Sequence, residues 1–304
     1  MAFPSPIIGM RILLDSRDLI DLVQYSHPPV AEFCDYLHAG DHQIVLCFSN
    51  VRELAGPLGR GADFIEVRPF LQSLEGMPHT YLKEFAVYPI EIQSAVDAFT
   101  NGTEYECGSP YVPRWDNTLE LLRGQQRGAV ENLVGLRLDN IVNFVQLGNP
   151  GVFAPPEQCL APLQQIFEND RNQLRAGRAR DPQHFIDAFR RHAERGGIEL
   201  PAGREDELAR WVHANPNRSP GIRLHHETYR ALLENYEDIP QVGDFTDLAI
   251  IRAIPYVDAA TLDRRMRAYC AIAAQRMRGA GAAHNYGDRV YANTPALVEG
   301  HPNV

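Results

Sequence analysis

Two short apolar runs near the start of the chain predict buried strands. They cover residues 11–14 and 43–48, and polar residues typical of helix N-caps follow each one. The apolar spacing between them predicts one helix through residues 19–23 and another over residues 30–38, and a further helix is expected over residues 51–55. Two buried strands joined through helices form a parallel pair with a right-handed crossover. Both strands are therefore expected to end at the same edge of a sheet.

The middle of the chain has a different pattern. Strand-like runs are scarce, and loops rich in proline and glycine separate long helical periods. Helices are expected over residues 93–100, 119–145, 159–176, 182–195 and 204–213. We interpret residues 58–224 as a mostly helical insertion or subdomain.

The last eighty residues return to an α/β pattern. Helices are expected over residues 227–236, 248–254 and 262–277, with a short strand-like segment over 255–257 and a last strand over 289–292. Residues 1–57 and 225–304 are therefore expected to form one discontinuous α/β core.

The composition is that of an ordinary globular protein, with 304 residues, 44% hydrophobic residues and 22% charged residues. A formal net charge of −10 argues against a protein that coats nucleic acid by bulk charge, although an enzyme with an acidic site can carry such a charge. We expect no membrane association, because no apolar run approaches the roughly 18 residues of a membrane span. No signal peptide is recognisable at the start, and the five cysteines are scattered without a CxxC pair, so we expect a cytoplasmic protein.

Four acidic residues occupy the predicted junctions between strands and helices. Asp15 ends the first strand, Glu53 lies in the helix after the second strand, Asp247 begins a helix, and Asp263 follows the late strand-like segment. Each alone would be interpreted as a cap or a turn residue. Their recurrence at successive junctions predicts that they converge at one edge of the sheet, where open α/β folds bind ligands.

Clustered carboxylates have a specific chemistry. Like charges raise one another's pKa, and hard divalent cations such as Mg²⁺ or Mn²⁺ relieve the repulsion through oxygen ligands. Two such ions about 4 Å apart can activate water and stabilise the leaving oxygen of a phosphodiester. The pattern therefore predicts metal-dependent phosphodiester hydrolysis. Five neighbouring residues are candidates to cap helices, orient the carboxylates or, for the arginine, touch a phosphate: Ser16, Ser49, Asn50, Thr246 and Arg264.

The segments LLDSRDLI, SNVREL, GDFTDLAI and YVDAATLDRRM resemble, in this order, the motifs of the PIN-domain nucleases. That family includes ribonuclease toxins of bacterial toxin–antitoxin modules and relatives of flap endonucleases. Asp15 matches its first aspartate, and Glu53 matches its glutamate, with Ser49 in the preceding polar place. Asp247 matches the third motif, with Asp244 a close second choice. Asp263, between Thr261 and Arg264, matches the fourth.

The resemblance implies a PIN-like three-layer α/β/α core with a mostly parallel sheet, carrying a large, mainly helical insertion. It implies an endoribonuclease that uses Mg²⁺ or Mn²⁺, with DNA left open as a substrate, and it leaves room for a homodimer and for a protein inhibitor or partner. It covers only about 135 residues, at the two ends of the chain. Because Asp247 and Asp263 are closer in sequence than in compact members, Asp258 stays open as the fourth or a fifth ligand.

Two other classes of function share parts of this pattern. The chain could be a PIN-like interaction or scaffold module that binds protein or RNA, in which the carboxylates only cap helices. A haloacid-dehalogenase phosphohydrolase would also begin with an aspartate after the first strand, but that family requires DxD, and the third residue here is Arg17.

Overall fold

The computed structural model describes residues 9–112, 138, 139, 142, 143, 146, 157–177 and 182–300. Its centre is a six-stranded sheet in the order β4-β3-β2-β1-β5-β6. The strands are β1 (Arg11–Leu13), β2 (Gln43–Leu46), β3 (His79–Leu82), β4 (Tyr111–Val112), β5 (Ala259–Thr261) and β6 (Val290–Tyr291). All neighbours pair in parallel except β3 and β4, which are antiparallel at the edge.

Alternate residues of the strands pack into two separate cores, one on each face of the sheet. In β1, Leu13 belongs to one core, whereas Ile12 belongs to the other. In β5, Ala260 and Ala259 divide in the same way. This period of two is the signature of a sheet that is covered on both faces. The fold is therefore an α/β fold in which helices, sheet and helices form three layers.

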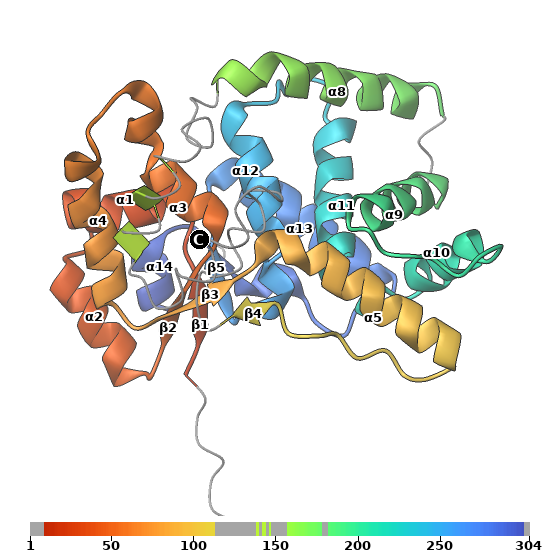
Figure 1. Cartoon of the computed structure of the whole chain (residues 1–304), viewed down its shortest axis with the longest axis horizontal. Coiled ribbons are helices and arrows are strands. Elements are labelled where there is room, and N and C mark those ends of the chain that lie inside the picture. Colours follow the sequence, from red (N-terminus) through yellow and green to blue (C-terminus); the bar gives the residue numbers. More distant parts are fainter. Residues whose placement is uncertain are drawn as a thin grey trace, which may run out of the picture.

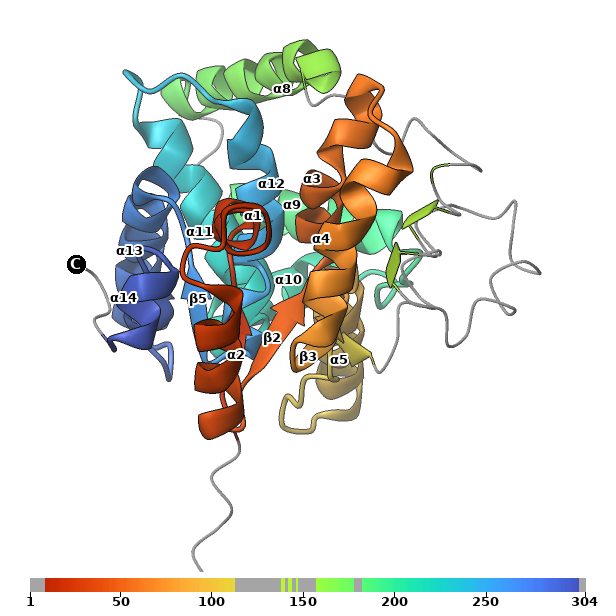
Figure 2. The ribbon, with the colours of Figure 1, turned by 90° about the vertical axis from the view of Figure 1, so that its left-hand side faces the viewer.

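The first face is covered by helices from the start and the end of the chain: α1 (Ser16–Tyr25), α2 (Val30–Ala39), α3 (Phe48–Leu54), α4 (Phe64–Gly76) and α14 (Thr294–Val298). Figure 2 looks towards this face. Helix α4 begins at a complete capping box, in which Asp63 accepts a hydrogen bond from the N–H of Ile65 and Glu66 accepts one from the N–H of Asp63.

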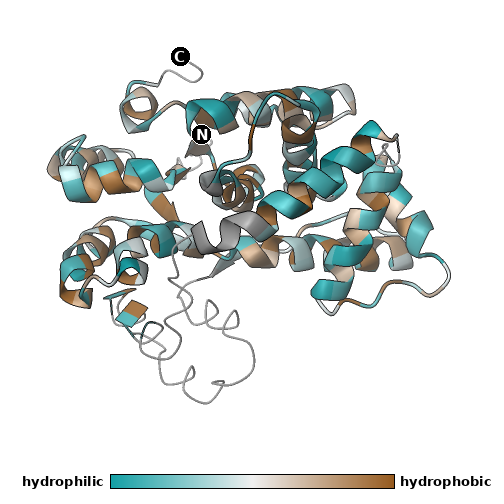
Figure 3. Ribbon diagram, turned by 90° about the horizontal axis from the view of Figure 1, so that it is seen from above, coloured by the Kyte–Doolittle hydropathy of each residue, from teal (hydrophilic) through white to brown (hydrophobic). Residues whose placement is uncertain are grey.

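The second face is covered by α5 (Val87–Asn101), α8 (Glu157–Arg175), α9 (Gln183–Arg195), α10 (Glu205–His213), α11 (Pro220–Glu234), α12 (Val242–Ile251) and α13 (Arg264–Gly279). In Figure 1 these helices lie on the opposite side of the sheet from α1 to α4. Seen from above in Figure 3, most helices carry both hydrophobic and hydrophilic residues, as amphipathic helices do when one side faces a core.

Several predicted elements are confirmed, and others need correction. The predicted strands over 11–14 and 43–48 correspond to β1 and β2, although β2 ends two residues earlier because helix α3 begins at Phe48. The late strand is β5, which begins at Ala259, whereas residues 255–257 form the end of a 3-10 helix and its cap. Most of the helix expected over 119–145 lies outside the described residues.

The sheet also draws on the segment that was expected to be a helical insertion. Strands β3 and β4 lie within residues 58–224, and β3 pairs with β2 over three residues. Only Tyr81 and Leu82 of β3 are buried, so its sequence lacks the continuous apolar run of β2. The helices expected over 182–195 and 204–213 correspond to α9 and α10, but they pack on the same core as Leu13 and Val45 of the sheet. Within the described residues, no helix combines the length and apolar character needed to cross a membrane.

Candidate functional site

Asp15 and Asp263 lie at the carboxyl edge of two neighbouring parallel strands. Asp15 follows β1 and Asp263 follows β5, and the Asp15 backbone N–H donates a hydrogen bond of 2.7 Å to the hydroxyl of Thr261, the last residue of β5. The strand order reverses between β1 and β5, because β1 leads on one side to β2 and β3 and β5 leads on the other side to β6. Ligands of open α/β sheets bind outside the carboxyl ends of the strands at such a switch point.

Glu53 reaches the same edge on α3, which packs against α1 and α12. The Asn50 side chain fixes α3, donating hydrogen bonds to the Leu14 carbonyl (3.1 Å) and to the Ser16 hydroxyl (3.2 Å). Glu84, which is buried, accepts hydrogen bonds from the N–H groups of Phe48 (3.1 Å) and Ser49 (2.7 Å) and so caps the first turn of α3. These contacts hold Glu53 in a fixed relation to the end of β1.

The pKa shifts of Asp15 and Asp247 indicate that the four predicted carboxylates lie near one another. Burial raises the pKa of Asp15 to about 7, and the charges of Asp18, Glu53 and Asp263 contribute to this rise. Burial also raises the pKa of Asp247 to about 9, with added repulsion from Asp15, Asp263 and Glu53. Asp15 and Asp247 are only 7% and 8% exposed. Residues more than 200 positions apart therefore share one negatively charged region.

The carboxylates are not, however, arranged as a group of metal ligands in this structure. No group of three or more His, Cys, Asp and Glu side chains in the described part of the chain is arranged to hold a metal ion. Coulombic repulsion acts over several ångströms, whereas Mg²⁺ and Ca²⁺ need oxygen ligands at about 2.0–2.6 Å. The Asp263 carboxylate accepts a hydrogen bond from the N–H of Met266 (2.7 Å) and so caps α13. Carboxylate oxygens are the donors that a hard cation takes, so the residues fit such an ion by their chemistry.

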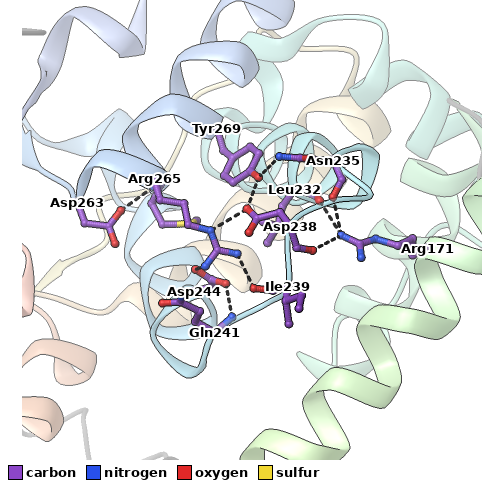
Figure 4. A network of polar contacts seen from close by, with 11 residues as sticks. Arg171, Leu232, Asn235, Asp238, Ile239, Gln241, Asp244, Asp263, Arg265 and Tyr269 are labelled. Carbon is purple, nitrogen blue, oxygen red and sulfur yellow. Dashed lines mark hydrogen bonds and ion pairs between the residues drawn. The ribbon is translucent and has the colours of Figure 1, made fainter.

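Asp244 is held by other partners. It is 3% exposed, it accepts a hydrogen bond of 2.6 Å from the N–H of Gln241, and it lies 3.0 Å from the guanidinium group of Arg265. Figure 4 shows Arg265 between Asp244 and Asp238, to which its Nε atom donates at 2.8 Å. These contacts join the start of α12 to α13. The charge of Asp244 also raises the pKa of Asp247, so Asp244 lies beside the four carboxylates, and its expected role as an assisting metal ligand stays a prediction.

The network extends to α8 through a buried arginine. Arg171, which is 4% exposed, donates hydrogen bonds to the carbonyls of Asn235 (2.7 Å) and Asp238 (2.9 Å). The Asp238 side chain also accepts a hydrogen bond from the hydroxyl of Tyr269 (Figure 4). Helix α8 therefore braces the loop that leads into α12.

Asp258 does not join the cluster. Its carboxylate accepts a hydrogen bond of 2.9 Å from the N–H of Arg11, the first residue of β1, and it precedes β5. Asp258 therefore lies at the amino edge of strands whose carboxyl edge carries Asp15 and Asp263. At about 3.3 Å per residue, three residues of strand separate the two edges. This geometry separates Asp258 from the four carboxylates and gives no support to it as the fourth or a fifth ligand.

The other predicted residues are placed as follows. Ser16, Ser49, Asn50 and Thr246 are buried, and Arg264 is exposed on the first turn of α13. Two further residues near the carboxylates, Asp18 and Arg265, were not among the site residues predicted from the sequence. Asp18 accepts hydrogen bonds from Thr261 and from the N–H of Thr294 (3.1 Å), and Arg265 pairs with Asp244. Only the short spacing of Asp15 and Asp18 on one helix was visible in the sequence.

No match was found for the chain among protein-family models, among curated proteins or among solved structures.

Proposed function

We propose that the protein is a divalent-metal-dependent nuclease, whose site is the carboxyl edge of β1 and β5. The observation that carries the proposal is the gathering of Asp15, Glu53, Asp247 and Asp263 at the switch point of the sheet, where the charges of Glu53 and Asp263 add to the effect of burial on the pKa of both Asp15 and Asp247. Such carboxylates repel one another when they are ionised in a buried region, and a bound cation offsets this repulsion while keeping them deprotonated. The PIN-like order of the four acids in the sequence supports the same function.

The four side chains differ in how deeply they are buried. Asp15 and Asp247 are the buried pair and would hold the cation, while Glu53 and Asp263 are half-buried and more accessible to water. Bound Mg²⁺ or Mn²⁺ would supply positive charge that activates water and offsets the charge of the phosphodiester. Thr261 and Asn50 hold the backbone around Asp15 in place.

RNA is the substrate we propose, on the strength of the resemblance alone, with DNA as the alternative to test beside it. The chain's net charge of −10 means that attraction of a polyanion has to come from local arginines and bound cations.

The first prediction concerns Asp15→Asn. The variant should fold normally but should retain less than about 1% of manganese-dependent cleavage of single-stranded RNA, because loss of a ligand exceeds the 10–100-fold effects of residues behind the ligands. Cleavage of a labelled oligonucleotide measures the rate, and circular dichroism checks the fold.

Asp258→Asn is the matched control. It makes the same chemical change at the amino edge of the same strands, so its activity should stay within about twofold of wild type. Full activity in the Asp15→Asn variant would remove Asp15 from the site.

A second candidate function is a scaffold or interaction module. It is favoured by the absence of a closed ligand set among the described residues and by the use of Asp263 as a helix cap. Calorimetric titration with Mn²⁺ separates the two functions. The nuclease should bind Mn²⁺ specifically and lose this binding in the variant with both Asp15→Asn and Asp247→Asn, whereas a scaffold should show no such binding in either protein.

A further inference from the structure

A cavity of about 360 Å³ adjoins two of the four carboxylates. It lies between the first turns of α1 and α13 and the residues that lead into α14, and Asp15 and Asp263 line it, whereas Glu53 and Asp247 do not. Its volume is within the range of pockets that hold small ligands. The cavity is therefore a compartment beside the four carboxylates, on the side of β5 and β6.

Three arginines line this cavity. Arg17 is the second residue of α1, and Arg264 and Arg267 lie one turn apart on α13, so they share a helix face. Guanidinium groups bind phosphate through a planar fork of donors. The first turns of α1 and α13 also direct their backbone N–H groups towards this end of the sheet, which favours an anion.

The acids in the cavity wall already have partners. Asp18 accepts hydrogen bonds from Thr261 and Thr294, and Asp21 lies 3.9 Å from Arg17. By contrast, Arg264 is exposed and forms no ion pair with any residue that the structure describes. Once cations neutralise Asp15 and Asp263, three arginines face two remaining aspartates, Asp18 and Asp21, which leaves a surplus of one positive charge.

We propose that this cavity is a subsite for a second phosphodiester group of the substrate strand, next to the one positioned at the carboxylates. Arg264 and Arg267 hold this group, and Arg17 lies at the rim. The inference rests on the proposed nuclease function and deepens it, because it names the side from which the strand continues.

Binding of RNA tests the subsite without relying on catalysis. The probe is a fluorescein-labelled eight-nucleotide single-stranded RNA with a 5′-hydroxyl, titrated with otherwise wild-type protein in Ca²⁺, a hard cation that can neutralise the carboxylates in place of Mn²⁺. Gel analysis of the RNA after the titration confirms that it is uncut. Adding Arg264→Gln and Arg267→Gln together should weaken binding about tenfold or more at low salt. The slope of log K against log salt should become shallower by about 0.7 for each phosphate group that the variant no longer neutralises.

Arg278→Gln is the matched control. Arg278 is an exposed arginine on α13, about 21 Å along the helix from Arg264, and it does not line the cavity. Its affinity and salt slope should match the parent within about twofold. Equal affinity and slope in the Arg264→Gln, Arg267→Gln protein would overturn the subsite, even if the wild type cleaves RNA.

Two further measurements separate failure of the subsite from failure of the proposed nuclease function, and an internal phosphate from a terminal one. If the wild type neither cleaves RNA nor binds Mn²⁺, the nuclease proposal fails, and weakened RNA binding by the double variant would still establish the cavity as a phosphate site. RNA carrying a 5′-phosphate is titrated in parallel. A weakening seen only with this probe would assign the cavity to a terminal phosphate monoester and would overturn the chain-internal subsite.

Discussion

Asp15 and Asp247 are carboxyl groups whose setting favours the neutral form. Burial raises the pKa of Asp15 to about 7 and that of Asp247 to about 9, and the negative charge of one group opposes ionisation of the other. In the unfolded chain both groups would titrate near pH 3.9. The folded protein therefore retains protons that the unfolded protein releases as the pH rises above about 4.

The second prediction follows from this linkage. Without metal, the free energy of unfolding should fall as pH rises from about 4 towards 7–9, because the folded state binds more protons over this interval. Asp247→Asn should remove much of this fall and should stabilise the metal-free protein at pH 8 on the order of 2 kcal/mol. Urea unfolding with EDTA at pH 5 and pH 8 measures both effects.

Added Mn²⁺ provides the converse test. It should stabilise the wild type at pH 8 by preferential binding to the folded state, and Asp247→Asn should lose this gain. The Asp258→Asn control should keep the wild-type pH dependence and the response to Mn²⁺. A wild type whose stability rises between pH 5 and pH 8 in EDTA would contradict the raised pKa of both groups.

At the scale of elements, each carboxylate of the candidate site lies at the N-cap or in the first two turns of a helix. Helix α1 begins after Asp15, α13 begins after Asp263, and α12 carries Asp247 in its second turn. The first turns of α12 and α13 are joined by the Arg265–Asp244 ion pair (Figure 4). This contact is one of those that set their relative position, and with it the approach of Asp247 to Asp263.

The third prediction removes that contact. Arg265→Met should destabilise the protein by about 3 kcal/mol, because Asp244 would remain buried without its cation. Adding Asp244→Asn should recover most of this stability, since a neutral amide in the same place costs less to bury. Chemical denaturation of the two single variants and the double variant gives the coupling energy.

A coupling energy near zero would show that Arg265 and Asp244 do not act as a pair. If the pair acts only on stability, the double variant should regain both stability and Mn²⁺ affinity. If it positions Asp247, stability should return while Mn²⁺ affinity stays reduced.

At the scale of the whole molecule, the helical part and the sheet share one core. Glu91 of α5 is completely buried and accepts hydrogen bonds from the N–H groups of Gly221 (2.6 Å) and Ile222 (2.8 Å) at the start of α11. Burial raises the pKa of Glu91 to about 7, against the lowering effect of these bonds. This contact ties residues 130 positions apart and leaves no room for a side chain at Gly221.

The fourth prediction compares two glycines. A Cβ atom at Gly221 would lie 2.6 Å from the Arg252 carbonyl oxygen and 2.7 Å from Val87, whereas one at Gly243 would meet nothing within 4 Å. Gly221→Ala should therefore destabilise the protein by about 2 kcal/mol through overpacking. Gly243→Ala in α12 should be neutral or stabilising by about 0.5 kcal/mol. Thermal unfolding distinguishes them, and equal melting temperatures would contradict the close packing of α5 on α11.

Local sequence pattern determined the elements that carry strong periodicity. The apolar runs of β1 and β2 predicted two buried parallel strands, and helical spacing predicted α2, α9 and α10 closely, because burial of one face imposes its period on the residues. The pattern missed β3 and misplaced β5. Ala259 and Ala260 have little intrinsic preference for strands, and they form one because β1 and β6 supply pairing partners on both sides.

The sequence by itself determined which carboxylates are available near the junctions of strands and helices. Only the tertiary structure decided between Asp258 and Asp263, because pairing of β5 with β1 places them at opposite edges of the sheet. Only the tertiary structure committed Asp244 to Arg265 and gathered three arginines beside Asp15. Pairing register and side-chain partners depend on contacts between residues far apart in the chain, and local periodicity carries no information about them.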